Sequence, residues 1–328
     1  MNFLKKLFNT VTICCFSMLL MSLSCSKSDD DDAVVKPLRD YSTQYGTDLA
    51  NIITYLKTHK LNSAITDYSA NVNNSNLFLE TTNVSESLWS LPSTGSIYPK
   101  LLHKEVKIES HMTAPYLVYY IVFNEGNTTE KPCPLDNVLV TYRGSSLANV
   151  SDVVSATEFE NSPVSVLFNL NRVVSGWQEV FPLFGKGTFD EVATGNGPNV
   201  YTNYGAGIMF LPSGLGYYQQ SSTNMPEYSP LVFSFQLQNF VRVDTDSDGI
   251  MTVDELVKNS EGNYVKESYI DTDGDNYYDF NDIDDDNDGF TTRNEIKDAD
   301  GNLIPFIDIP TCTGGNGKKR HLDSKCHN

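Results

Sequence analysis

Basic residues are scarce in this chain, which has 23 lysines and arginines against 42 aspartates and glutamates among 328 residues. Because nucleic-acid binding needs a basic surface to neutralise phosphates, the formal net charge of −19 argues against nucleic acid as a partner. The imbalance is local, since residues 244–300 hold 19 acidic side chains against four basic ones. Such a density repels itself unless cations neutralise it.

Long hydrophobic runs are absent except at the N-terminus. There Lys5 and Lys6 precede an apolar run from Leu7 to Leu23, which is too short and too early for a confident membrane span. Residues 1–24 are therefore predicted to be a secretory signal peptide.

The end of this signal, Met21-Ser-Leu-Ser-Cys25, resembles a bacterial lipobox, whose cysteine is lipidated after cleavage. Residues 25–36 form an acidic tether too charged to pack, and its Ser-Asp-Asp run resembles the surface-export signal of Bacteroidetes lipoproteins. The resemblance implies a lipid anchor at Cys25 and an outer-membrane lipoprotein of the cell envelope, periplasmic or surface-exposed. An ordinary signal peptide and a plain linker remain the alternative.

Cysteine is rare as well, with six in the chain, three of them in or directly after the signal. In an oxidising export compartment, Cys312 and Cys326 are the expected disulfide, closing a short loop in the C-terminal tail, residues 304–328. Cys133 is expected to be an unpaired thiol. The alternative is a metal site built from both cysteines with His321 and His327, although that spacing matches no usual zinc pattern.

Residues 37–125 are predicted to hold a helix and a sheet extension. Apolar residues spaced by threes and fours mark one face of a helix over residues 37–60: Tyr41, Tyr45, Leu49, Ile52, Ile53 and Leu56. Residues 61–98 are rich in Asn, Ser and Thr and are expected to be irregular. Residues 114–123 are β-branched and aromatic, which indicates a buried strand.

Residues 126–242 carry the signals of an α+β domain. A short helix is expected to begin at Gly176, and the Gly- and Asn-rich residues 185–203 suggest a long hairpin connection. Strands are expected at residues 137–142, ending at Gly144, at residues 166–170, at residues 207–212 and at residues 231–237.

Five segments of residues 134–240 also resemble, in the correct order, the FKBP-type peptidyl-prolyl isomerases. They are Val140-Thr-Tyr142-Arg-Gly144, Phe159-Glu160-Asn-Ser162, Val173-Val174-Ser-Gly176-Trp177, Leu211-Pro212-Ser213-Gly-Leu-Gly-Tyr217, and Met225-Pro226 with Leu231-Val-Phe233. The resemblance implies an antiparallel sheet wrapped on a short helix, with an aromatic pocket that isomerises X–Pro bonds in proline-containing polypeptides and needs no cofactor.

The resemblance also implies roles for individual residues. Trp177 would form the floor of the pocket, and Tyr217 would offer its hydroxyl to the substrate backbone. The Val174 backbone N–H would face a ligand carbonyl. The other implied pocket residues are Tyr142, Phe159, Phe168 and Phe233 in the walls, Val173 at the border, and Glu160 at a position usually held by Asp.

Five departures from the family pattern leave a second reading open. Glu160 is one methylene longer than the usual Asp, and the connection between Gly144 and Phe159 is longer than usual. Tyr218 stands where the family has Gly, Glu227 replaces a Pro, and the connection at residues 185–203 is longer than usual. The alternative is a non-catalytic, calcium-binding surface lipoprotein that uses the FKBP fold to bind proteins. That reading predicts a pocket blocked by Tyr218 or by the long connection.

Residues 243–303 contain three calcium-type loops. The first and last read D-x-D-x-D-G with Glu at position twelve, a spacing that brings about six to eight oxygens to one hard cation. The middle loop has Asn276 in place of the Gly and ends in Asp instead of Glu. The candidate ligands are Asp244, Asp246, Asp248, Ile250 and Glu255, then Asp271, Asp273, Asp275, Tyr277 and Asp282, then Asp284, Asp286, Asp288, Phe290 and Glu295.

The spacing of these loops excludes paired EF-hands, since one residue between Asp282 and Asp284 leaves no room for a helix. A helix over residues 253–258 is possible after the first loop only. The tandem arrangement resembles thrombospondin type 3 repeats, which have little regular structure and are ordered by their ions. Structural calcium is therefore the predicted ligand.

Overall fold

The computed structural model describes residues 36–194, 197, 199–260 and 262–326. The described residues from Arg39 onward form one compact unit. The helices and strands are α2 (Tyr41–Thr58), β1 (His59–Leu61), β2 (Phe78–Glu80), β3 (Lys100–Val106), β4 (Tyr116–Asn124), β5 (Asn137–Val150), β6 (Val153–Asn169), α3 (Ser175–Val180), β7 (Thr188–Phe189), α4 (Glu191–Thr194), β8 (Tyr201–Thr202), β9 (Gly205–Leu211), β10 (Leu231–Val241), β11 (Leu256–Lys258), β12 (Tyr264–Tyr269) and α5 (Thr292–Glu295).

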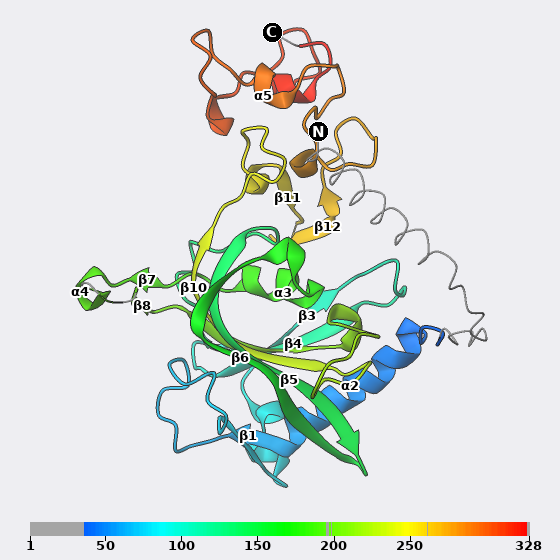
Figure 1. Ribbon diagram of the computed structural model, residues 1–328, viewed down its shortest axis with the longest axis vertical. Coiled ribbons are helices and arrows are strands. Elements are labelled where there is room, and N and C mark those ends of the chain that lie inside the picture. Colours follow the sequence, from blue (N-terminus) through cyan, green and yellow to red (C-terminus); the bar gives the residue numbers. More distant parts are fainter. Residues whose placement is uncertain (1–35, 195–196, 198, 261, 327–328) are drawn as a thin grey trace, which may run out of the picture. The chain divides into compact units, whose positions relative to one another are not determined.

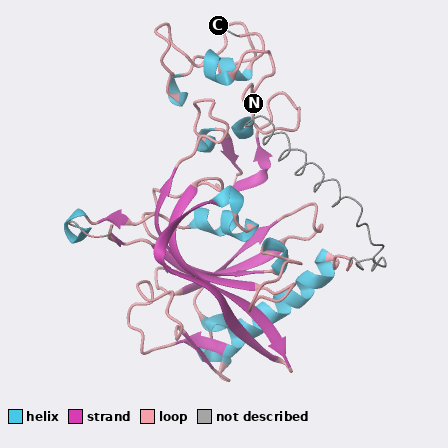
Figure 2. Cartoon of the chain, in the orientation of Figure 1, coloured by secondary structure: helices cyan, strands magenta, loops and turns pink. Residues whose placement is uncertain are grey.

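The centre of the fold is a six-stranded antiparallel sheet in the order β3-β4-β9-β10-β5-β6. Helices α3 and α2 lie on its opposite faces (Figure 1). The predicted fold class is confirmed, because the chain is α+β, with an antiparallel sheet wrapped on a short helix and an extension of little regular structure (Figure 2).

Two hydrophobic cores follow from side-chain alternation along the strands. In β9, Met209 and Leu211 join the core on the α3 side, whereas Ile208 and Phe210 join the core on the α2 side. Strand β9 is buried along its whole length because both of its faces are covered. In β10, the predicted inward face is confirmed, since its residues lie in the α3-side core: Leu231, Phe233, Phe235 and Leu237.

Three expectations about secondary structure are wrong. The strand expected at residues 166–170 is only the last part of β6, which begins at Val153. Strand β5 does not end at Gly144 but continues to Val150, where Ser151 and Asp152 turn with positive φ into the long strand β6. The helix proposed over residues 253–258 is instead a short 3₁₀ turn followed by β11, which pairs with β12. Strand β3 was not predicted from the sequence. It occupies one edge of the sheet.

Helix α2 confirms the predicted helix and buries Ile52 and Leu56 as predicted, but polar residues replace part of the predicted apolar face. Its buried residues include Gln44 and Asp48, whereas Leu49 and Ile53 are only half-buried. The helix begins at Asp40, whose carboxylate accepts a hydrogen bond from the Thr43 N–H at 2.8 Å, an N-cap.

The C-terminal extension packs against the segment that precedes β5, through a small core in which Leu135 joins Leu256 and Phe280. Cys312 and Cys326 form the predicted disulfide, with Cα atoms 5.6 Å apart, so they are not free to ligate a metal, and the alternative metal site is wrong. Cys133 is buried and unpaired, as predicted.

Several predictions concern residues outside the described part of the chain. These are the signal peptide over residues 1–24, the lipid anchor at Cys25, all of the tether but residue 36, and His327. Among the described residues, no helix is both long and apolar enough to cross a membrane.

Candidate functional site

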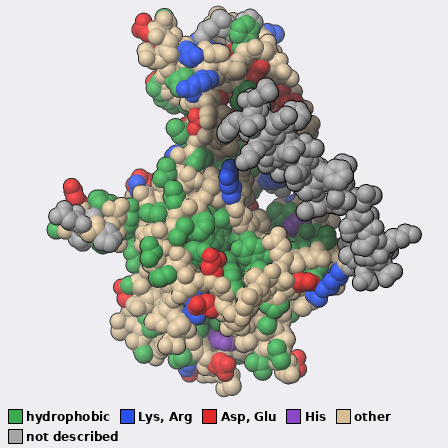
Figure 3. Space-filling view, in the orientation of Figure 1, with side chains coloured by type: hydrophobic (Ala, Val, Ile, Leu, Met, Phe, Trp, Pro, Cys, Tyr) green, Lys and Arg blue, Asp and Glu red, His purple; other side chains and the backbone are tan. Residues whose placement is uncertain are grey.

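A cavity of about 470 Å³ opens on the α3 side of the sheet, between β5, β6, α3 and the turn after β9. Hydrophobic side chains gather over β6 and α3 on the face seen in Figure 3. Of the residues singled out from the sequence, all but Phe159 line this cavity: Tyr142, Glu160, Phe168, Val173, Val174, Trp177, Tyr217 and Phe233. The structure thus gathers segments that are almost a hundred residues apart in the chain.

Phe159 stands behind the lining. Its ring packs edge-on against Phe233 at 5.8 Å and against Tyr217 at 6.4 Å between centroids. Gly144 permits this packing, because a Cβ there would lie 2.7 Å from the Phe159 ring and 2.9 Å from the Phe233 ring. Arg172 and Gln220 also line the cavity and were not identified from the sequence, since neither has a motif signal.

The floor of the cavity is Trp177, which is 2% exposed. Its ring meets Tyr142, Phe168 and Phe233 edge-on, with centroids 5.3, 5.6 and 5.3 Å away. Edge-to-face packing holds the indole in one orientation. The indole N–H is buried and has no hydrogen-bond partner among the described residues.

Two tyrosine hydroxyls of the cavity remain protonated at neutral pH. Burial, and then the nearby Glu160 carboxylate, raise the pKa of Tyr142. The same two causes, in the same order, raise the pKa of Tyr217. Both groups are therefore hydrogen-bond donors placed beside an apolar floor, whereas the cavity offers no activated nucleophile.

Neither Tyr218 nor the described part of the connection 185–203 blocks the cavity. Tyr218 points elsewhere, stacking on Tyr41 at 4.2 Å and donating its hydroxyl to the Arg39 carbonyl at 2.6 Å. Tyr218 also has a φ of 49°, which explains why the family pattern has Gly at this position. In the part of the chain that the structure describes, no residue of the connection 185–203 lines the cavity.

Asp48 of α2 fixes the turn that carries Tyr217. Its Oδ2 accepts hydrogen bonds from the Ser213 N–H at 2.7 Å and from the Ser213 hydroxyl at 2.6 Å, and its Oδ1 accepts one from Gln44 at 2.6 Å. Burial raises the pKa of Asp48, and these hydrogen bonds lower it. The sequence did not predict this link, because Gln44 and Asp48 are polar and were not among the apolar residues expected to be buried.

Replacing Asp48 with alanine should lower the free energy of unfolding by about 1–3 kcal/mol, since the buried Ser213 N–H would lose its acceptor. Chemical denaturation measures this loss. Asp40→Ala, which removes only the N-cap of the same helix, is the matched control. Asp48→Ala alone should also shift the NMR signals of Tyr217; unchanged signals in a destabilised variant would contradict the positioning role.

The three acidic loops of the extension share one backbone geometry. The amide at position six donates to the first Asp in each loop, at 3.1 Å from Gly249 to Asp244, from Asn276 to Asp271 and from Gly289 to Asp284. All three position-six residues have positive φ, so Asn276 replaces Gly as expected. The first, third and fifth side chains converge in each loop, with ligand atoms within 4.8 Å of one another.

The carboxylates at position twelve of the three loops have different neighbours. Glu255 groups with Asp248 and with Asp285, a residue that was not among the predicted ligands. Asp282 and Glu295 belong to none of the groups found among the described residues. Asp282 instead accepts a hydrogen bond from the Asp284 N–H at 3.0 Å.

Burial and mutual repulsion raise the pKa of several of these carboxyls. Burial, followed by Asp248, raises the pKa of Glu255 to about 10, and burial, followed by Asp279, raises that of Asp285 to about 9. Burial also raises the pKa of Asp248 to about 7 and that of Glu295 to about 8. Such clusters fit a hard cation, which would supply the missing positive charge.

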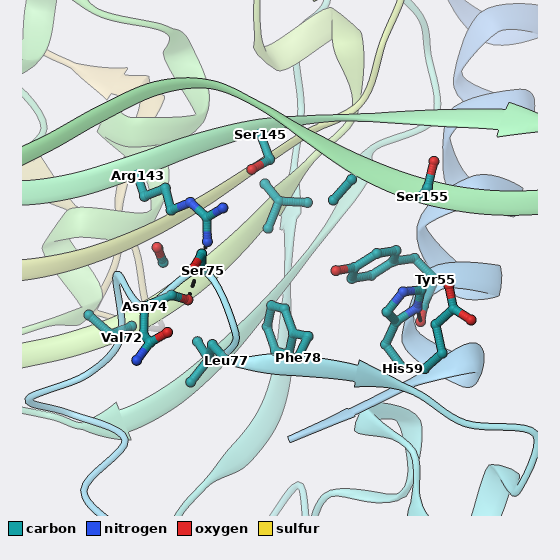
Figure 4. Close-up of a pocket in the computed structure, with 14 residues that line it drawn as sticks. Tyr55, His59, Val72, Asn74, Ser75, Leu77, Phe78, Arg143, Ser145 and Ser155 are labelled. Carbon is teal, nitrogen blue, oxygen red and sulfur yellow. Dashed lines mark hydrogen bonds between the residues drawn. The ribbon is translucent and has the colours of Figure 1, made fainter. Parts of the chain in front are cut away.

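A second cavity, of about 270 Å³, lies on the α2 side of the sheet (Figure 4). Tyr55 and His59 face it from the end of α2, and Arg143 and Ser145 face it from β5. The Arg143 guanidinium donates to the Asn74 carbonyl at 3.2 Å. The sequence did not predict this cavity, because residues 61–98 have no periodic pattern.

Comparison with known proteins matches residues 245–319, which hold the three loops except Asp244, to a family model described as BamM C-terminal. No curated protein matches the chain. Among solved structures, a peptidyl-prolyl cis-trans isomerase from Pseudomonas syringae pv. tomato is similar at 20% identity and a TM-score of 0.28, covering 38% of this chain and 76% of that one.

Two further solved structures are similar to parts of this chain. FkpA from Escherichia coli is 23% identical with a TM-score of 0.28, over 42% of this chain and 51% of that chain. The three FKBP domains of wheat FKBP73 are 16% identical with a TM-score of 0.30, over 43% of this chain and 51% of that chain. This chain therefore spans about half the length of these two structures, and their likeness assigns no activity to it.

Proposed function

We propose that this chain is a peptidyl-prolyl cis-trans isomerase of the cell envelope, held by a lipid at Cys25 and extended by a calcium-binding segment. The observation that carries the proposal is the α3-side cavity, in which the residues implied by the family resemblance converge on the Trp177 floor. Its clients would be polypeptides whose folding waits for an X–Pro bond to rotate.

Such a cavity promotes rotation without a nucleophile. The X–Pro bond has partial double-bond character, and rotation about it costs about 20 kcal/mol. The planar amide is more charge-separated than the twisted one, so an apolar site disfavours the planar ground state more than the twisted transition state. Apolar contact with Trp177, Phe168 and Phe233 would supply that environment.

Directed donors would add to this effect by holding the substrate carbonyls as the bond twists. The Tyr217 hydroxyl and the Val174 backbone N–H are the donors we assign to this task. Glu160 would keep Tyr142 and Tyr217 protonated and oriented.

Replacing Tyr217 with phenylalanine should lower kcat/KM for a proline peptide about three- to tenfold, because one hydrogen bond to the twisted amide is lost. Tyr218→Phe is the matched control, because the Tyr218 hydroxyl bonds to Arg39 and not to the cavity. Equal losses of kcat/KM in the two variants would contradict a role for the Tyr217 hydroxyl in catalysis.

The folding role is tested with a protein whose refolding is limited by prolyl isomerisation. The full chain should accelerate the slow refolding phase in proportion to its concentration, and the fast phase should not change. If the chain instead binds the unfolded protein and leaves the slow rate unchanged, the alternative of a non-catalytic binding lipoprotein is favoured.

We further propose that the extension over residues 243–303 binds calcium through its three loops. Converging carboxylates, shared loop geometry and the absence of sulfur or imidazole from the clusters support a hard cation. The role we assign to the ions is structural, because the apolar core between the outer loops is small.

A further inference from the structure

One group of carboxylates in the extension does not belong to any single loop. Asp248 and Glu255 come from the first loop and Asp285 from the last, yet their ligand atoms lie within 4.8 Å of one another. Asp285 is the second residue of its loop, a position that does not ligate in the D-x-D-x-D-G pattern. The loop pattern therefore assigns no ligand role to the Asp285 carboxylate.

These three side chains are buried and only partly hydrogen-bonded. They are 2%, 5% and 1% exposed for Asp248, Glu255 and Asp285. Both carboxylate oxygens of Glu255, both of Asp285 and the Oδ2 of Asp248 have no hydrogen-bond partner among the described residues. Buried carboxylate oxygens without partners are costly, and three such groups side by side repel one another. A cation between them resolves both costs.

Contacts around the three carboxylates bring the first and the last loop next to each other. Ile250 of the first loop packs with Ile296, directly after the last loop, in one buried cluster. The Arg293 guanidinium donates to the Ser247 carbonyl at 3.1 Å. The Asp285 N–H donates to the Thr292 hydroxyl at 3.2 Å, which fixes the backbone that presents its carboxylate.

We propose that Asp248, Glu255 and Asp285 hold a calcium ion shared between the first and the last loop. The ligands are all carboxylate oxygens, which suits a hard cation and not zinc or copper. The shared ion clamps residues 244–255 to residues 284–295, so that the extension is ordered as one body and not as three separate loops. This inference rests on the proposed calcium binding of the extension and is independent of the isomerase activity.

The test uses hydrogen exchange of the full chain in calcium, read loop by loop, together with calorimetric calcium binding. Asp285→Asn should bind one tight calcium ion fewer than the wild type and should lose amide protection in residues 244–255, although the substitution lies in the last loop. Glu255→Gln should show the reciprocal loss in residues 284–295. Protection of β9 and β10 in each variant verifies that the sheet is folded.

Two charge-matched variants provide the comparison. Asp284→Asn removes a ligand of the last loop alone and should leave residues 244–255 protected, and Asp254→Asn removes an exposed carboxylate outside every group. If Asp285→Asn binds as many ions as the wild type and changes only residues 284–295, the shared ion is refuted while calcium binding stands. If the wild type binds no calcium, both proposals are refuted.

Discussion

Replacing Trp177 with alanine should lower the isomerase rate constant at least about tenfold, and the free energy of unfolding by about 3–5 kcal/mol. The indole is the floor of the α3-side cavity and packs edge-on against Tyr142, Phe168 and Phe233. Its removal deletes a large part of the core and, on the proposed mechanism, the apolar contact with the proline ring. Denaturant unfolding and NMR exchange on a proline peptide measure the two effects.

Trp89 is the only other tryptophan and provides the control. It packs against the core on the α2 side of the sheet, away from the cavity. Trp89→Ala should therefore reduce stability and leave the rate constant unchanged. Trp177→Phe, which retains much of the packing, separates lost contact from partial unfolding. A folded Trp177→Ala protein with full activity would remove Trp177 from the mechanism.

Chelating calcium should remove most amide protection from residues 244–300, whereas the six-stranded sheet keeps its protection. The outer loops share only a small apolar core around Ile250, Ile296 and Ile309, and their carboxylates repel one another without a cation. Hydrogen exchange with and without a chelator measures the difference, and restored calcium should reverse it.

Magnesium is the informative control for this prediction. It demands a smaller, near-octahedral set of oxygens and retains its waters, so it should restore little protection at equal concentration. An extension that is equally protected with calcium, with magnesium and with chelator would contradict a calcium-ordered segment. Such an outcome would mean that the apolar contacts and the disulfide suffice to order it.

Much of the fold could be predicted from local patterns. Strand β10 was predicted from apolar residues alternating along one face, strand β9 from a short apolar segment, and the loops from the spacing of Asp and Gly. These signals depend on a few neighbouring residues. The cavity was predictable in composition because the family resemblance supplied five ordered segments. Whether the cavity is open could not be predicted, because that depends on the direction of the Tyr218 side chain.

The parts that escaped prediction are set by contacts between distant residues. Asp48 breaks the apolar stripe of α2, and only its bonds to Ser213, far along the chain, explain why it is buried. In the sequence Asp285 is one of several acidic residues in a row, and only the fold places its carboxylate beside that of Glu255. Gly144 was predicted to end β5, but the strand continues through it. The missing side chain leaves room for the rings of Phe159 and Phe233.

NMR exchange spectroscopy on a tetrapeptide with one X–Pro bond, with the full chain in calcium, decides whether the chain is an isomerase. We expect the cis–trans exchange rate to rise in proportion to protein concentration. We also expect one of the two tryptophan indole signals, that of Trp177, to shift as peptide is added. An exchange rate that stays at the uncatalysed value with a folded protein would contradict the isomerase and leave a binding protein on this scaffold.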